Sequence, residues 1–553
     1  MKFKKSISFL LVFVMLLSMS ATAAYAQNTA SFQNITDRSV IPVINIAGDA
    51  DPLYSKDGKK LLDLSDMSDP DNATSNESDS DSVMESVANV LYPFLVEGLL
   101  TNNWDNYYAS LQKEVGEILG DALLDPNGNV TNGSDIAQSR RNENEYNRTH
   151  NKSSGGYYFY NTYHFWYDWR RDPIEIADEF HAYIQDVKAV TKKDKVAIIG
   201  KCLGVNVVFA YIQKYGLDDI QGIAIDGGVV NGAESMSEII SGKFVLDGNA
   251  ITRFMIDCNA FGLEIDDLIT YTIDLLTKAQ VFDTVAGITK ATIYNRIIHG
   301  VTSALALSTT FTWPSYWAGV TTEDYETAKE YVFGEEGSDK RTEYAGLIAK
   351  LDNYDRVVRQ NVDDILKKIV DTDGVNLCII SKYGMQMLPC IESRNNIGDQ
   401  FASVTRSSFG ATTSSIYDTL SDEYIQSVTA SGNERYIAPD KQVDASTCLY
   451  PDYTWFVKGA SHTNWTRGEN ALLLTVATAN TQLTVNDFEI SQFMVYDSEN
   501  DQMLKMTKDN CDCYNWSASY EDDNPTFFQK IILYFKSLFT WLKEVFNRLN
   551  SES

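Results

Sequence analysis

Short apolar runs alternate with stretches of helical periodicity along much of the chain. Apolar side chains recur at helical spacing over 174–190 and 207–215, on either side of a short apolar run. The runs with the length and β-branched content of buried strands are 41–46, 196–199, 220–225, 375–380 and 454–457. Strands that alternate with helices in this way predict a doubly wound, mainly parallel sheet.

The remaining patterns divide the chain into further segments. A polar, acidic stretch at 65–82 and an Asn-rich stretch at 125–151 predict exposed loops within one insertion at about 65–151. Helical patterns between the third and fourth strands predict a cap. The predicted organisation is a signal peptide (1–26), a first part of the core (27–228), a helical cap (229–374), a second part of the core (375–465), a β appendage (466–520) and an amphipathic helix (521–553).

The first residues have the pattern of a secretory signal. Basic residues precede an apolar run at 7–17, and Ala24-Tyr25-Ala26 is a small-x-small cleavage site. We therefore expect export, with cleavage near Ala26, and a secreted or cell-envelope-associated protein. No later stretch is apolar over a length that would span a bilayer.

The second strand runs into a Gly-x-Cys-x-Gly turn and then a helix. A strand–turn–helix with small residues at Gly200 and Gly204 is the setting of a nucleophile elbow, in which the central residue takes a strained backbone conformation. Here that residue is Cys202, at the N-terminus of a helix, which favours the thiolate. The alternative is a buried structural cysteine in an ordinary strand–helix turn.

Two backbone N–H groups are candidates for an oxyanion site. The first strand ends in a glycine turn at Gly48, ahead of the elbow strand, and the N–H of Asp49 follows it. The N–H of Leu203 comes directly after the candidate nucleophile. Backbone donors suffice to stabilise a developing oxyanion. The alternative for the first turn is an ordinary connection between a strand and a helix.

His462 is the candidate base. It is one of five histidines and is the one that follows a late strand through a glycine loop, where the base of a nucleophile–acid–base array falls in chain order. Asp440 precedes it by about one strand–loop unit and is the predicted acid that orients the imidazole. Asp444 and Asp226 are the reserve candidates.

Charge and cysteine content narrow the function classes. The formal net charge of −30 excludes nucleic acid as a natural partner and fits a soluble exported chain. The chain has 7 cysteines, so six remain if Cys202 is a nucleophile, and their pairing cannot be read from the sequence. Cys511-x-Cys513 is too sparse for a metal site, and we expect neither a metal nor a cofactor.

Two aromatic segments have alternative interpretations. Asp168 and Arg170, two residues apart after an aromatic run, favour a structural ion pair over a substrate role. The aromatic residues at 313–317 lie in the predicted cap and favour a substrate pocket slightly over a core position.

Several motifs together resemble a known family. Tyr167-Asp-Trp-Arg170, then a helix, then Lys195-Val-Ala-Ile-Ile-Gly200, resembles the α/β-hydrolase branch of lecithin:cholesterol acyltransferase-like enzymes and bacterial lipases. Asp440-Lys-Gln-Val443 and Gly459-Ala-Ser-His462 are similar to the acid and base motifs of that family. The resemblance covers roughly residues 40–60, 155–232 and 375–465.

The chain also departs from the family pattern at three places. Cys202 stands where the family has serine, Lys201 where histidine is common, and Ala47-Gly48 where His-Gly is usual. A cysteine in the elbow is similar to dienelactone hydrolases. The resemblance implies an α/β-hydrolase fold and a hydrolase, lipase or acyltransferase acting on ester, thioester or lipid acyl groups through Cys202, His462 and Asp440.

Two further hypotheses follow from the sequence. The alternative function is a non-catalytic protein that binds a lipid or small molecule on the same scaffold, with Cys202 inert. Residues 527–549 form a broad apolar stripe with lysines opposite, so the helix either binds a membrane surface or packs on the body.

Overall fold

The structure is a computed structural model that describes most of the predicted core. The described residues are 41–48, 51–62, 97, 103–152, 162–245, 300, 310–416, 418–464, 466–488, 491–497 and 500–511. The predicted signal peptide (1–26), the acidic loop (65–82) and the C-terminal helix (521–553) lie outside these residues, as do Asp49 and part of the predicted cap (246–299).

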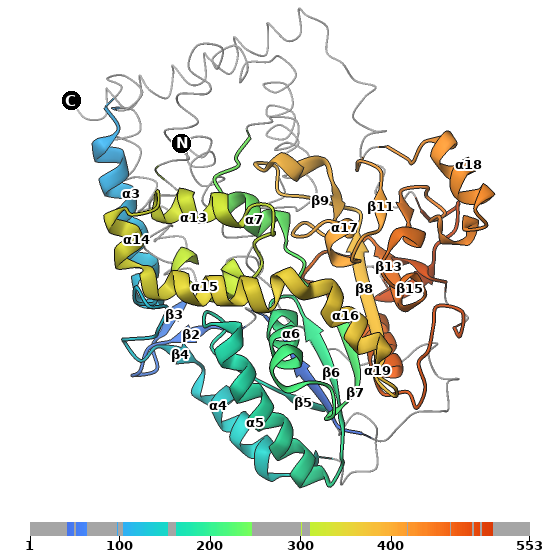
Figure 1. The fold of residues 1–553 in the computed structure, drawn as a ribbon, viewed down its shortest axis with the longest axis horizontal. Helices are drawn as coiled ribbons and strands as arrows, with labels where there is room; N and C mark the ends of the chain where they lie inside the picture. Colours follow the sequence, from blue (N-terminus) through green and yellow to red (C-terminus); the bar gives the residue numbers. More distant parts are fainter. Residues whose placement is uncertain are drawn as a thin grey trace, which may run out of the picture.

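Eight strands form one sheet at the centre of the molecule (Figure 1), in the order β15-β14-β13-β8-β7-β6-β1-β5. Their bounds are β1 (Val43–Ile46), β5 (Thr162–His164), β6 (Val196–Lys201), β7 (Ile220–Asp226), β8 (Asn376–Tyr383), β13 (Thr454–Lys458), β14 (Phe493–Asp497) and β15 (Gln502–Lys505). All neighbours are parallel except β14 and β15. A mostly parallel sheet with helices is an α/β fold, as the alternation of strands and helices predicted.

The order of the strands reverses beside β1. The chain goes from β1 to the edge strand β5, crosses back to β6 on the other side of β1, and then continues outward through β7, β8 and β13. Ligands of open α/β sheets bind at the carboxyl ends of the strands near such a reversal. The fold therefore directs attention to the ends of β1 and β6, where Gly48 and Cys202 lie.

Both faces of the sheet are buried, which is why its strands read as continuous apolar runs. On β6, Ile198 packs into one core, while Ala197 and Ile199 pack into the other, because successive side chains of a strand point to opposite faces. The first core includes residues of α5 (Pro173–Thr191), α6 (Gly204–Tyr215), α15 (Ala345–Val357) and α16 (Val362–Asp371), and the second includes residues of α19 (Arg467–Ala477).

Local signals set the ends of α5, the helix that leads to the elbow strand. The Asp172 side chain accepts a hydrogen bond from the N–H of Ile174, and Pro173 occupies the first turn, where its missing N–H costs nothing. The helix stops at Lys192, whose left-handed backbone has a φ of 56°. These caps fix where the chain turns into β6.

The prediction of a β appendage at 466–520 is wrong for residues 467–477, whereas strands do occur at 493–497 and 502–505. Residues 467–477 form α19, which begins with a capping box between Thr466 and Glu469 and packs on the sheet. A five-residue apolar run such as 472–476 does not distinguish a strand from a buried helix, and the capping signal was the deciding feature. β14 and β15 are not separate either, because they extend the main sheet.

The predicted loop at 125–151 also contains regular structure. It includes β4 (Asp135–Ile136), which forms a small sheet with β2 (Leu53–Tyr54) and β3 (Lys60–Leu62), and α4 (Gln138–Thr149). α4 packs on α5 through polar contacts: Asn147 donates to the Tyr183 hydroxyl at 2.9 Å, and Arg148 pairs with Asp186 at 2.7 Å. A helix attached by polar groups has no apolar stripe for the sequence pattern to reveal.

Helices make up the regular structure of the described residues between β7 and β8. They include α7 (Glu234–Ile240), η5 (Thr310–Thr312), α12 (Pro314–Trp317), α13 (Tyr325–Phe333), α14 (Asp339–Glu343) and η6 (Arg359–Asn361), besides α15 and α16. That they form a cap over the sheet edge stays a prediction.

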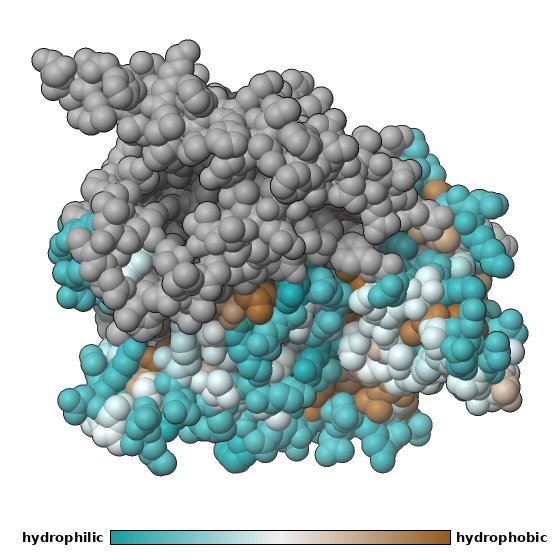
Figure 2. Space-filling view, turned by 90° about the horizontal axis from the view of Figure 1, so that it is seen from above, coloured by the Kyte–Doolittle hydropathy of each residue, from teal (hydrophilic) through white to brown (hydrophobic). Residues whose placement is uncertain are grey.

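The described surface seen from above is mainly hydrophilic, with apolar side chains in small separate areas (Figure 2).

A long excursion joins β8 to β13. Its elements are β9 (Met385–Gln386), η7 (Glu392–Asn395), β10 (Ile397–Gly398), α17 (Val404–Ser407), β11 (Thr412–Thr413), α18 (Asp422–Ala430), η8 (Glu434–Tyr436), β12 (Val443–Asp444), η9 (Ala445–Thr447) and η10 (Pro451–Tyr453). β9 pairs with β10 and β11 with β12, both antiparallel. The excursion carries three carboxylates that bear on the question of which acid orients His462: Asp399, Asp440 and Asp444.

Candidate active site

Cys202 occupies a sharp turn between β6 and α6. Its φ is 49°, in the left-handed region that residues with a side chain rarely adopt. The N–H of Cys202 donates to the carbonyl of Asp226 on β7 at 3.2 Å, and its carbonyl accepts from the N–H of Val205 at 3.1 Å. These bonds hold the strained conformation, which is the backbone geometry that the elbow pattern predicted.

The two glycines around the turn leave room for neighbouring backbone. A Cβ on Gly204 would collide with the carbonyl of Ile46 at the end of β1 and lie 2.8 Å from its carbon atom. A Cβ on Gly48 would lie 3.0 Å from the backbone nitrogen of Leu203 and 3.3 Å from the Cβ of Cys202. The end of β1 therefore lies directly against the elbow because both positions lack side chains.

The two predicted oxyanion donors have different outcomes. The backbone nitrogen of Leu203 lies beside the Gly48 turn at the start of α6, where the turn predicted it. Asp49, the other predicted donor, lies outside the described residues. The Tyr167 hydroxyl donates to the carbonyl of Ala47 at 2.7 Å, which fixes the backbone just before this turn.

His462 pairs with Asp399. The imidazole Nδ1 lies 2.8 Å from the Asp399 Oδ2, and the backbone N–H of His462 donates to the Asp399 carbonyl at 2.8 Å. The ring is 8% exposed and the carboxylate is fully buried. The N–H groups of Phe401 and Ala402 donate to the other carboxylate oxygen at 3.0 and 2.8 Å. This arrangement fixes the position and the tautomer of the imidazole.

The second ring nitrogen of His462 is buried next to Cys202. Nε2 has no partner of ordinary hydrogen-bond geometry among the described residues. Burial alone would lower the pKa of His462, but the Asp399 charge and the charge and hydrogen bonding of Cys202 raise that pKa well above its ordinary value.

The charge on His462 acts back on its acid. Burial raises the pKa of Asp399, but the His462 imidazolium and the N–H donors of Ala402 and Phe401 outweigh it and lower that pKa below its ordinary value. The Phe401 ring lies over the imidazole, with a centroid distance of 4.8 Å. The pair is therefore both charged and shielded from water.

The prediction that Asp440 orients His462 is wrong. Asp440 pairs with Lys458 at 3.0 Å, accepts a hydrogen bond from the Tyr383 hydroxyl at 3.0 Å, and accepts another from the N–H of Gln442. The last bond closes a turn at Lys441, whose φ is 59°. The Asp-x-x-Val motif here is thus a turn signature, because an aspartate readily bonds the backbone two residues on.

The two reserve acids are also engaged elsewhere. Asp444 accepts from the Tyr424 hydroxyl and from the N–H of Ser446, and so caps a short helix. Asp226, at the end of β7, pairs with Lys382 at 3.0 Å and with Lys201 at 3.6 Å. Of the candidate carboxylates, Asp399 alone bonds the ring of His462 within the described part of the chain.

Sequence reasoning missed Asp399, although the sequence holds one usable signal. Asp399 follows β10 in the loop after β8, and β8 is the strand next to β13, which precedes His462. A search of the loop after the neighbouring strand would have included it. Gln400, the next residue, has a φ of 85°, so the acid lies in a strained turn of the kind found at functional sites.

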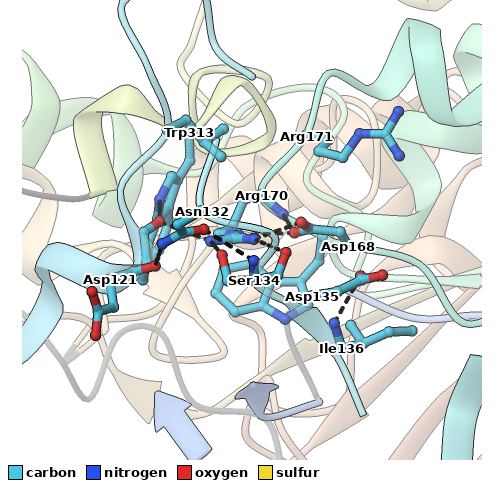
Figure 3. A network of polar contacts seen from close by, with 12 residues as sticks. Asp121, Asn132, Ser134, Asp135, Ile136, Asp168, Arg170, Arg171 and Trp313 are labelled. Carbon is cyan, nitrogen blue, oxygen red and sulfur yellow. Dashed lines mark hydrogen bonds and ion pairs between the residues drawn. The ribbon is translucent and has the colours of Figure 1, made fainter. Parts of the chain in front are cut away.

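Asp168 and Arg170 form a structural ion pair, as the sequence favoured (Figure 3). The side chains are fully buried and lie 2.6 Å apart, and the guanidinium also donates to the carbonyl of Ala122 and to the hydroxyl of Ser134. Trp313 donates to the same Ala122 carbonyl. The aromatic residues at 313–317 are buried in the first core, and a role for them in lining a substrate pocket stays a prediction.

Among the described residues, no three His, Cys, Asp or Glu side chains lie together in a way that could hold a metal ion. No disulfide joins the cysteines of the described residues, which are Cys202, Cys378, Cys390, Cys448 and Cys511. No helix among the described residues has both the length and the apolarity to cross a membrane.

Comparisons with known proteins add little. No protein-family model and no curated protein matches the chain. Among solved structures, one described as the crystal structure of a Tle4-Tli4 complex is similar over 63% of this chain and 76% of that chain, at 11% identity and a TM-score of 0.24. The fold assignment rests on the sheet itself.

Proposed function

We propose that this protein is a cysteine-dependent α/β-hydrolase that cleaves or transfers ester, thioester or lipid acyl groups. The observation that carries the proposal is the convergence of Cys202, held at a φ of 49° on the elbow, with a buried His462–Asp399 pair joined at 2.8 Å. A strained nucleophile next to a base that a third group orients is the geometry of covalent catalysis.

The proposed reaction has two steps. The Cys202 thiolate, paired with the His462 imidazolium, attacks the acyl carbon, and the bond to the leaving group breaks as that group takes the proton from the imidazolium. Water or an alcohol then attacks the acyl-thioester and gives its proton to His462, and the cysteine leaves as the thiolate that pairs with the imidazolium. Asp399 stays ionised and stabilises the imidazolium in both steps.

The Leu203 N–H is the proposed oxyanion donor beside this centre. Leu203 is the N-cap residue of α6, and the N-terminal dipole of this helix favours negative charge at the elbow. The turn at Gly48, just after β1, lies against the backbone nitrogen of Leu203. The N–H of Asp49, the next residue, is the second oxyanion donor of the proposal. The site thus needs no metal or cofactor for acyl transfer.

Export of the mature chain remains part of the proposal.

Turnover of short p-nitrophenyl esters and mass spectrometry of acylated Cys202 test the proposal. We expect Cys202→Ala to lose at least about 10⁴-fold in turnover and to lose acylation. Cys448→Ala is the matched control, because that thiol is also buried but belongs to a separate core. Unchanged turnover in Cys202→Ala refutes the mechanism, and a wild-type protein without turnover or acylation supports the non-catalytic binding protein instead.

A further inference from the structure

The floor of the site is a buried cluster of four charged side chains. Lys201 on β6, Asp226 on β7, Lys382 on β8 and Glu469 on α19 are each at most 6% exposed. Lys382 lies 3.0 Å from Asp226 and 3.6 Å from Glu469, and Lys201 lies 3.6 Å from Asp226. Two cations thus balance two anions in a place where an unpaired charge would be costly.

Lys382 reaches the loop that carries His462. Its ammonium donates to the backbone carbonyl of Asn464 at 2.5 Å. The Asn464 side chain accepts from the N–H and the hydroxyl of Ser461 at 3.0 and 2.6 Å, and its own N–H donates to the Ser461 carbonyl at 3.1 Å. These bonds close the turn 461–464, so the lysine holds a turn in which His462 is the second residue.

The same lysine is connected to the elbow. Asp226, its closest anionic partner, accepts the N–H of Cys202 through its backbone carbonyl. Lys201 is connected differently: its ammonium donates to the Asn470 side chain within α19 at 3.0 Å, beyond the turn that carries His462. The two lysines therefore share a charge cluster, and Lys382 connects that cluster to the turn that carries His462 through its hydrogen bond to the Asn464 carbonyl.

The protonation states agree with this geometry. Burial lowers the pKa of Lys382, but Asp226, Glu469 and the nearby Asp399 outweigh it and raise that pKa above its ordinary value. For Lys201 burial dominates, and its pKa is lowered in spite of Asp226 and Glu469. Lys382 is the more firmly charged of the two.

We infer that Lys382 is a positioning residue, which sets the distance between the Cys202 sulfur and the His462 imidazole by fixing the turn 461–464 against the end of β7. The inference rests on the proposed function of Cys202 and His462. Lys382 itself touches neither reacting atom. Its loss would allow the histidine turn to shift relative to the elbow, and a shift of about 1 Å in a catalytic array can cost about 100-fold in rate.

Two double variants with the same remaining charges test this inference. Glu469→Gln removes one anion and keeps a side chain suited to the capping box. In the double variant with Lys382→Met, the charged residues that remain in the cluster are Lys201 and Asp226. In the double variant with Lys201→Met, they are Lys382 and Asp226. The two proteins therefore have the same formal charge and differ in which lysine remains.

The readout is the pH profile of Cys202 alkylation by iodoacetamide in the full chain, followed by mass spectrometry of the Cys202 peptide. We expect the Lys382→Met/Glu469→Gln variant to lose about tenfold or more in alkylation rate at neutral pH, and its pH profile to approach that of His462→Ala. The Lys201→Met/Glu469→Gln variant should stay within about threefold of the alkylation rate of Glu469→Gln alone. Ester turnover should follow the same order.

Equal losses in the two folded pairs would overturn the inference, since the lysines would then act only through charge balance. If the Lys382 pair does not fold, Lys382→Gln in the Glu469→Gln background takes its place, with the same expected order. A wild-type alkylation profile that is unaffected by His462→Ala would instead refute the proposed function, so the two failures are distinguishable.

Discussion

Asp399→Asn compared with Asp440→Asn tests most directly which aspartate orients His462, the one that the structure assigns or the one that the sequence predicted. Both substitutions replace a carboxylate that is shielded from water with an amide of the same shape. Asp399 bonds the ring of His462, whereas Asp440 bonds Lys458. The structure predicts a large loss of activity for the first variant and little for the second.

The magnitude follows from the geometry of the pair. Two unit charges at 2.8 Å attract by about 6 kcal/mol at an effective dielectric constant of about 20, an energy that burial of both groups partly offsets. Each 1.36 kcal/mol corresponds to about tenfold in rate. We therefore expect Asp399→Asn to lower kcat/KM by about 10³- to 10⁴-fold, the range seen when the orienting acid of a comparable array is changed to an amide.

The assay is ester turnover together with Cys202 alkylation, normalised to folded protein by circular dichroism. Asp440→Asn should stay within about threefold of wild type in both, although it lowers the melting temperature by leaving Lys458 without its carboxylate. A small effect of Asp399→Asn beside a large effect of Asp440→Asn would refute the assignment of the acid.

The pH dependence of stability adds a second readout for the same variant. The pKa of His462 is raised, so its contribution to stability is fully present below about 6.5 and is lost as the pH rises through the folded value. The pKa of Asp399 is lowered, so its contribution is present above about 3.9 and is lost as the pH falls through the folded value. The stability difference between wild type and Asp399→Asn should be largest between these limits and decline on either side.

Three further predictions concern the frame of the site. Gly204→Ala should destabilise the fold by about 1–3 kcal/mol and reduce Cys202 alkylation, because the added Cβ meets the carbonyl of Ile46; unchanged unfolding would contradict the close packing of β1 on the elbow. Arg170→Met should cost about 3–5 kcal/mol in unfolding free energy by leaving Asp168 uncompensated, while kcat/KM per folded molecule is unchanged. Deletion of 524–553 should abolish sedimentation with anionic vesicles at an unchanged melting temperature if the C-terminal helix binds membranes, and a lower melting temperature with no change in vesicle binding would show that it packs on the body.

The core strands and the elbow were predictable because their signals are local. Strands buried on both faces must be apolar throughout, so the runs at 196–199 and 220–225 predicted β6 and β7 within one or two residues. The turn at Cys202 was predictable because a strand, small residues and a helix follow one another within a few positions. His462 could be nominated since few histidines compete with it and a late strand precedes it.

The acid, the floor of the site and the place of β14 and β15 in the main sheet were decided only by the tertiary structure. Asp399 and His462 are 63 residues apart, and which of several carboxylates meets the imidazole depends on how the β8–β13 excursion folds. An aspartate such as Asp440 matches a motif equally well when it closes its own turn and pairs with a lysine. Lys382 and Glu469 meet because β8 and α19 pack together, and no local pattern encodes the partner of a buried charge.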